Sequence, residues 1–223
     1  MESLSGMDKR VSIDKIRAAL LAREPRRLNG ELKRKLRPSA VLAPVYEQDG
    51  EVRLLLTQRT NDVRHHKGQI SFPGGRRDAD DSSYAETAKR EFEEEMGISR
   101  GEVEILGALD EQPVISYYRI VPFVARLGYP FEADPSPDEI ERVITLPLVG
   151  FLDPSVHRMT TNEFEGRLYP IHFYEVGGEM VWGATGRIVS QLLEVCFGYR
   201  APLYEEFLRL HREDEESRGF LPL

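Results

Sequence analysis

The sequence predicts an α+β fold, in which mixed β-strands surround one strong helix and further helices lie at both ends of a single domain. Three observations support this prediction. Residues 83–97 show the clearest helical pattern in the chain, apolar segments typical of strands lie on both sides of it, and helical patterns lie near both termini. With 223 residues, the chain is long enough to bury a sizeable core.

The individual elements follow from local signals along the chain. Asp49-Gly50 is a turn pair typical of a β-hairpin and separates the first two apolar segments. Ser83 and Glu86 fit the capping box of the central helix, and Gly97 lies where a left-handed residue ends a helix. The predicted strands cover residues 40–46, 52–57, 103–109, 117–127 and 167–175. The predicted helices cover residues 11–24, 83–97, 188–197 and 202–216.

Composition and charge restrict the class of protein. A formal net charge of -8 argues against a general nucleic-acid binder, because phosphate backbones select for basic surfaces. The basic run at residues 32–37 is interpreted as a solvated linker, and Cys196 as a buried small hydrophobic residue. No apolar run reaches the roughly 18 residues that a membrane span needs. The amino terminus lacks the apolar core of a signal peptide, so the predicted location is the cytoplasm.

Three carboxylates lie on one face of the central helix. Glu91, Glu94 and Glu95 are spaced i, i+3 and i+4, which places them within one turn. Like charges at this spacing destabilise a helix by only about 0.2–0.5 kcal/mol per pair, so a solvated acidic face is one interpretation. A site for Mg²⁺ is the other, because this ion prefers hard carboxylate oxygens.

A glycine turn precedes this helix and favours the metal interpretation. Phe72-Pro73 reads as the end of a strand, and Gly74-Gly75 then allow the backbone to approach a ligand closely. A charged loop at residues 76–81 leads into the helix. Strand, glycine turn, charged loop and carboxylate helix together predict a binding site on a loop–helix unit.

This arrangement resembles the Nudix box, in which a glycine, five residues, an acid and a spacer precede the pattern R-E-U-x-E-E-x-G-U, where U is a bulky apolar residue. Gly75, Asp81 and the run from Arg90 to Ile98 match it. Two features differ from the general pattern: Asp81 replaces a glutamate, and eight residues rather than seven separate Asp81 from Arg90.

A longer match resembles the motif that precedes the box in coenzyme A pyrophosphatases, a Nudix subfamily. It comprises residues 55–59, Arg64, Gly68 and residues 69–75. That subfamily commonly has the aspartate and the longer spacer, while Thr60 replaces the Ser or Ala expected after Arg59. Residues 181–185 resemble a further segment of the same group, and the whole resemblance spans about Ser39 to Ile188.

The resemblance implies a Nudix-type α/β/α sandwich with a mixed β-sheet and flanking helices. It implies that Mg²⁺ or Mn²⁺ binds Glu91, Glu94, Glu95 and the Gly75 carbonyl, with Arg90 orienting the glutamates. The expected catalytic residues are Arg90, Glu91, Glu94, Glu95 and Glu139. Glu141 is the alternative to Glu139 as an added metal ligand or general base.

Substrate contacts are predicted around the glycine turn. The segment from Arg59 to Arg77 is locally cationic, which suits an extra phosphate such as that of coenzyme A. Pairing of these arginines with the acids of residues 78–81 is the alternative. The expected substrate-binding residues are Arg59, Arg64, Lys67, Gly74 and Arg76. Trp182 is interpreted as a core residue in preference to a stacking platform for adenine.

The predicted function is metal-dependent cleavage of coenzyme A or acyl-coenzyme A to 3′,5′-adenosine bisphosphate and 4′-phosphopantetheine or its acyl form. Cleavage of ADP-ribose or a dinucleoside polyphosphate, or nucleotide binding without catalysis, are the alternatives. The expected partner is this small molecule, with no nucleic acid or membrane, and a homodimer is possible. The predicted division is a helical extension and linker at residues 1–37, a Nudix hydrolase domain at 38–198 and a helical tail at 199–223.

Overall fold

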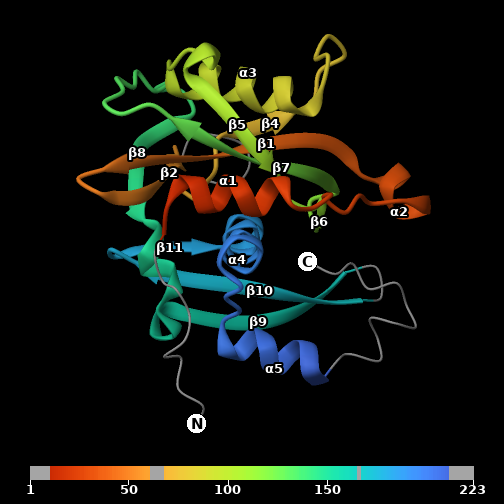
Figure 1. Cartoon of the computed structure of the whole chain (residues 1–223). Coiled ribbons are helices and arrows are strands. Elements are labelled where there is room, and N and C mark those ends of the chain that lie inside the picture. The colour runs from red at the N-terminus through yellow and green to blue at the C-terminus, as the bar shows by residue number, and fades with distance from the viewer. Residues whose placement is uncertain (1–10, 61–67, 165–166, 211–223) are drawn as a thin grey trace.

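A mixed eight-stranded sheet forms the centre of the computed structural model, which describes residues 11–60, 68–164 and 167–210 (Figure 1). Strands β3, β2, β1, β7 and β5 form the main path, while β4, β6 and β8 pair with β1, β7 and β2. Strands β1 and β7 are parallel and all other pairs are antiparallel. The strands are β1 (Arg37–Gln48), β2 (Glu51–Arg59), β3 (Ile70–Ser71), β4 (Gly74–Arg76), β5 (Val103–Ala108), β6 (Gln112–Val114), β7 (Tyr118–Leu127) and β8 (Ile140–Pro147).

Helices cover both faces of this sheet (Figure 1). Helix α3 (Tyr84–Met96) packs on one face, and α1 (Ile13–Leu21) and α4 (Gly183–Phe197) lie on the other. A second, antiparallel sheet follows beyond α4 and is covered in turn by α5 (Pro202–Leu210). Its strands are β9 (His157–Phe164), β10 (Arg167–Val176) and β11 (Glu179–Trp182). The α+β prediction of a mixed sheet with flanking helices is confirmed.

Strand β2 shows why the main sheet needs covering on both faces. Leu54 and Leu56 belong to the core shared with α1 and α4, whereas Leu55 belongs to the core shared with α3. Side chains alternate between the two faces of a strand, so a continuous apolar run must be buried on both sides. This run therefore places two cores back to back, with β2 between them.

The predicted elements are present, but several have different ends: α4 begins at Gly183 instead of residue 188, and α1 ends at Leu21 instead of residue 24. The β1–β2 hairpin turns at Asp49 and Gly50, whose φ angles are 53° and 77°. Ser83 caps α3 by accepting the amide of Glu86 at 3.2 Å, and Gly97 ends the helix in the left-handed region. Cys196 is buried, as expected, and no helix in the described part of the chain is long and apolar enough to span a membrane.

The interpretation of residues 32–37 as a solvated linker is correct for the charged side chains, which are exposed, but the backbone is not irregular. Residues Gly30–Lys35 form a short helix, α2, the side chain of Leu36 is buried, and Arg37 begins β1. Burial of Leu36 and pairing of Arg37 with β7 give this segment a regular structure that its charged composition does not indicate. The part of the predicted last helix beyond residue 210 lies outside the described residues. The described residues also include the short 3₁₀ helices η1 (Arg100–Glu102), η2 (Leu148–Leu152) and η3 (Pro154–Val156).

Two buried acids fasten the amino-terminal segment to the main sheet. Asp110 accepts the backbone amide of Arg26 at 2.7 Å, and Glu111 accepts that of Leu28 at 2.9 Å. Arg23 also pairs with Asp110, and both acids are almost fully buried. Buried carboxylates are stable only when they are paired and hydrogen-bonded, so the segment and the two acids depend on each other.

The second sheet contains a buried histidine pair. His157 Nε2 lies 3.0 Å from His172 Nδ1, between Tyr174 and Tyr204. Burial lowers the pKa of His157 from 6.5 to about 4. Burial, reinforced by the charges of His157 and Arg187, also lowers the pKa of His172 well below 6.5. Both rings are therefore neutral in the folded protein near pH 7.

This pair should make the protein less stable in mild acid. Between pH 6.5 and 4 the unfolded chain takes up protons that the folded chain does not, so the free energy of unfolding falls as pH falls through that window. We expect the His157 ring to contribute a loss on the order of 2–3 kcal/mol, measured by urea unfolding at pH 7.5 and 4.5. His157→Gln should show a smaller loss, and an equal loss in the variant would contradict the assignment.

Candidate functional site

The three predicted carboxylates of α3 occupy three different environments. The side chains of Glu95, Glu91 and Glu94 are 5%, 18% and 57% exposed. Two of them therefore point into the protein at the edge of the sheet and the third faces solvent. A plain solvated acidic face would expose all three, so this graded burial needs another explanation.

Arg90 joins two of these carboxylates to the loop before the helix. Its guanidinium lies 2.9 Å from both Glu91 and Glu94, and donates to the carbonyl of Arg76 at 3.1 Å. It also makes two hydrogen bonds to the buried carboxylate of Asp81, at 3.0 and 3.1 Å. Hydrogen bonding to Arg90 holds the pKa of Asp81 well below its usual range. Asp81 thus fixes Arg90, and Arg90 positions the two glutamates.

Asp81 is a site residue that the sequence-based set omits. Its carboxylate also accepts the amide of Asp78 at 2.9 Å and so closes the charged loop upon itself. The signal for this role is present in the sequence, because Asp81 is the acid of the Nudix box. The substitution for glutamate and the longer spacer concealed it, yet the shorter side chain reaches Arg90 across nine positions.

The glycine turn lies directly against the carboxylates. Strand β4 pairs with β1, so that Gly75 is opposite Ala40 and Gly74 is opposite Val41. A Cβ atom at Gly74 would lie 2.5 Å from the carbonyl oxygen of Ala40, and one at Gly75 would lie 2.6 Å from Oε1 of Glu91. Close approach to the β1 backbone therefore requires glycine at position 74, whereas a Cβ atom at position 75 would displace the Glu91 carboxylate that the Gly75 backbone borders.

Arg59 links the helix to the loop that carries the distal acid. Its guanidinium lies 3.5 Å from the carboxylates of Glu95 and Glu139, and the latter is exposed. Burial raises the pKa of Glu95 to about 8, the neighbouring Glu139 and Glu91 raise it too, and Arg59 opposes the rise. Burial likewise raises the pKa of Glu91. Carboxyl groups are thus gathered where water is largely excluded, and their charged forms are disfavoured in the absence of a cation.

This donor set fits a hard divalent cation. Carboxylate and backbone carbonyl oxygens are the ligands that Mg²⁺ and Mn²⁺ prefer. A cation beside Glu91 and Glu95 would relieve the repulsion and the burial cost that raise their pKa values. Within the described residues, no three His, Cys, Asp or Glu side chains converge on one point. The glutamates pair instead with Arg59 and Arg90.

The remaining predicted site residues lie around this centre or outside the described chain. Arg76 is exposed beside the glycine turn, and Glu141 is exposed at the start of β8. Arg77 donates to the carbonyl of Asp81 at 3.0 Å, and its guanidinium lies over the Tyr84 ring. Arg64 and Lys67 lie outside the described residues.

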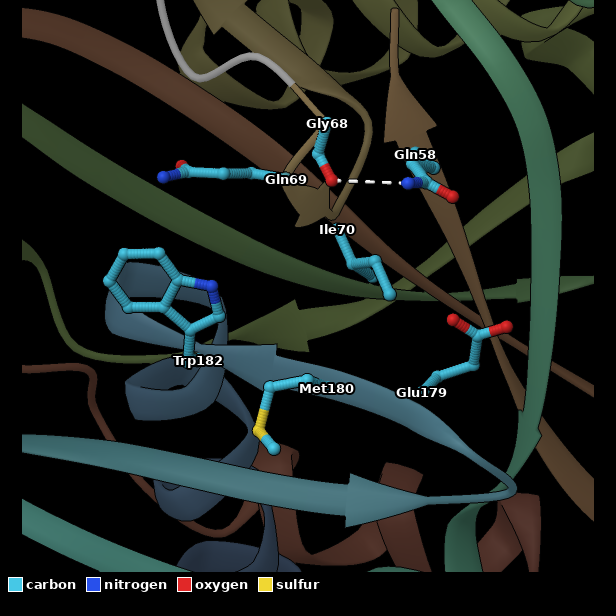
Figure 2. Close-up of a pocket in the computed structure, with 7 residues that line it drawn as sticks. All are labelled: Gln58, Gly68, Gln69, Ile70, Glu179, Met180 and Trp182. Carbon is cyan, nitrogen blue, oxygen red and sulfur yellow. Dashed lines mark hydrogen bonds between the residues drawn. The ribbon is translucent and has the colours of Figure 1, made fainter.

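A shallow hollow of about 410 Å³ lies at the same sheet edge, on the face away from α3. Figure 2 shows Trp182 and Gln69 at one end of it and Glu179 at the other. Trp182 is 40% exposed, so its interpretation as a core residue is wrong. One face of its ring stacks on Phe173, with centroids 5.8 Å apart and an interplanar angle of 2°. This contact holds the indole in place without burying it.

Comparison with known proteins gives consistent matches. The NUDIX domain model matches residues 36–164. Mitochondrial Nudix hydrolase 15 of Arabidopsis thaliana is 34% identical over 177 residues, which cover 75% of this chain and 61% of that protein. An uncharacterized Nudix hydrolase of Photorhabdus laumondii, NudL, is 33% identical over 158 residues, which cover 71% of this chain and 84% of that protein.

A third relative is a peroxisomal coenzyme A diphosphatase of Mus musculus, 32% identical over 136 residues, which cover 61% of this chain and 58% of that protein. The chain spans less than two thirds of the length of the Arabidopsis and mouse relatives. The family match covers more than half of the chain and includes the glycine turn, the charged loop and the carboxylate helix. The chain belongs to the Nudix family.

Proposed function

We propose that the protein is a metal-dependent pyrophosphohydrolase. The observation that carries the proposal is the burial of Glu91 and Glu95 beside the glycine turn. Arg90 positions the carboxylates of Glu91 and Glu94. Nudix hydrolases act on phosphorus anhydrides and generally use divalent metal ions. The largely buried carboxylates of Glu91 and Glu95 would supply the hard oxygen ligands that such an ion prefers.

Each side chain has a defined task in this proposal. Glu91, Glu94, Glu95 and the Gly75 carbonyl would hold Mg²⁺ or Mn²⁺. The bound ion would neutralise pyrophosphate oxygens and lower the pKa of a bound water. Glu139 is exposed across Arg59 from Glu95, where its carboxylate can take a proton from the attacking water. That water forms the new bond to one phosphorus atom while the bridging oxygen leaves with the other.

Coenzyme A or an acyl-coenzyme A is the substrate that we propose. Two observations support it: the motif across residues 55–75, and the mouse relative whose name states coenzyme A diphosphatase activity. Exposed Arg76 lies beside the turn, where a guanidinium can bind a phosphate. The products would be 3′,5′-adenosine bisphosphate and 4′-phosphopantetheine or its acyl form. A cytoplasmic location and a homodimer stay predictions.

The proposal is tested by incubating the purified protein with coenzyme A, ADP-ribose, NADH and diadenosine tetraphosphate. Each reaction is run with Mg²⁺, with Mn²⁺ and with a chelator, and the products are identified by mass spectrometry. We expect the two coenzyme A products only when metal is present. Cleavage of one of the other substrates, but not of coenzyme A, would support pyrophosphohydrolase activity and reject coenzyme A as the substrate. Metal-dependent binding without cleavage of any of the four would favour the nucleotide-binding alternative.

The Gly75 turn gives a further prediction. Gly75→Ala should reduce kcat/KM by roughly 10- to 100-fold, because the added Cβ must push the Glu91 carboxylate away. Steady-state kinetics with the best substrate measure the change. Gly128→Ala is the matched control, since nothing lies within 4 Å of a Cβ atom there. Equal rates for the two variants would show that the turn does not position Glu91.

A further inference from the structure

The indole of Trp182 is a rigid aromatic surface in the hollow of Figure 2. It stands at the end of β11, with one face stacked on Phe173 and 40% of the residue exposed. Because Phe173 already holds the ring in place, a ligand that stacks on the exposed part has little further side-chain entropy to remove. Ile70 and Met180 add apolar surface to the same hollow.

The polar groups of the hollow favour a neutral ligand. Glu179 accepts two hydrogen bonds from Arg142, at 2.7 and 2.8 Å, which balance its charge. Gln58 accepts another from Arg142 at 2.7 Å and donates to the carbonyl of Gly68 at 3.2 Å. Among the described residues that line the hollow, none is Lys or Arg. Within the described part of the chain, the cation beside the hollow is Arg142, which is already paired with Glu179. Trp182, Ile70 and Met180, by contrast, offer apolar surface to a flat, uncharged ring.

The hollow lies within reach of the proposed catalytic centre. Gln58 precedes Arg59, whose guanidinium contacts Glu95. Ile70 is four residues before Gly74, and a chain of that length spans at most about 14 Å. The hydroxyl of Thr185 donates to the carbonyl of Ile70 at 3.2 Å, which ties the start of α4 to β3. The Ile70 side of the hollow therefore lies close enough to the glycine turn for one nucleotide to contact both.

We propose that the hollow binds the nucleobase of the substrate, with the ring stacked on Trp182 while the pyrophosphate lies at the glycine turn. This inference rests on the proposed function, because it concerns the same substrate. It assigns the phosphates and the base to opposite faces of one sheet edge. The pantetheine arm of coenzyme A then lies outside the hollow.

Fluorescence tests the inference directly, because Trp182 is the single tryptophan of the chain. The protein is titrated in chelator with ADP, ribose 5-phosphate and 4′-phosphopantetheine, while calorimetry records binding. We expect ADP to quench the emission and the two ligands without a base to leave it unchanged. Quenching by 4′-phosphopantetheine but not by ADP would assign the hollow to the other arm. ADP that fails to bind, or binds without quenching, would also overturn the inference.

Variants separate stacking from simple packing. Loss of one base–aromatic stack corresponds to a Kd for ADP raised roughly 5- to 150-fold, which we expect for Trp182→Leu. Trp182→Phe should recover most of the affinity. Tyr129→Leu, which removes a similarly exposed aromatic ring elsewhere, should leave the Kd unchanged. Equal Kd values for wild type and Trp182→Leu would reject the inference even if the enzyme cleaves its substrate, whereas failure of the proposed function would appear as absent hydrolysis by wild type.

Discussion

Glu95→Gln is expected to reduce turnover by about 10²- to 10⁴-fold while the protein stays folded. Glu95 is the most buried of the three carboxylates, at 5% side-chain exposure, and faces Glu139 and Glu91. Glutamine keeps its shape but removes the charge that a metal would bind. Because burial raises the pKa of Glu95, its charged form opposes folding, so the neutral glutamine should not lower the free energy of unfolding.

The matched control lies two residues away on the same helix. Glu93 points away from the site and pairs with Arg100 at 2.6 Å. Glu93→Gln removes one exposed ion pair, worth at most about 1 kcal/mol, and should leave kcat close to that of wild type. Both variants are assayed with Mg²⁺ and Mn²⁺, and circular dichroism confirms their folding. Near-normal turnover in folded Glu95→Gln would remove Glu95 from the catalytic centre.

Asp81→Ala is expected to lower both stability and activity. It removes both hydrogen bonds that Asp81 accepts from Arg90 and leaves a guanidinium that is only 17% exposed without its main partner. Losing one member of such a pair costs roughly 2–4 kcal/mol. The freed Arg90 can then shift toward Glu91 and Glu94, so binding of Mn²⁺ should weaken as well. Urea unfolding and metal titration measure the two effects.

Asp78→Ala provides the comparison within the same loop. The Asp78 side chain is 68% exposed and its carboxylate lies 3.8 Å from Arg90. Its removal should change the free energy of unfolding by no more than about 0.5 kcal/mol, as for most surface substitutions. If Asp78→Ala were as damaging as Asp81→Ala, general loss of negative charge would explain both results. A large difference would instead establish Asp81 as the residue that positions Arg90.

Local patterns were sufficient to predict much of the fold. The cap at Ser83, the left-handed end at Gly97 and the turn at Asp49-Gly50 are each decided by neighbouring residues, and the structure has all three. Helix α2 and strands β4, β6, β8, β9 and β11 were not predicted, and β9 shows why. Residues 157–164 have no clear alternation of apolar and polar side chains, and pairing with β10 determines their conformation.

In the candidate site too, neighbouring residues determine some features and contacts between distant residues determine others. Helical periodicity placed Glu91, Glu94 and Glu95 on one face, but it could not distinguish their exposure. That difference arises from β4 and from the loop at Asp134 and Ser136, whose amides donate to the carbonyls of Met96 and Glu95. The contacts of Arg59 with Glu95 and Glu139 join residues 36 and 80 positions apart. No local pattern reports a contact at such distances.

The buried acids Asp110 and Glu111 imply that stable folding requires more of the chain than residues 36–164, which the family model matches. A chain shortened to residues 36–164 would lose Arg23 and the amides of Arg26 and Leu28. The carboxylate of Asp110 would then lose these donors, and that of Glu111 would keep only Arg119 at 3.5 Å. It would also lose Ile16 and Leu20 from the core. Residues outside the region matched by the family model therefore contribute to the stability of the main sheet.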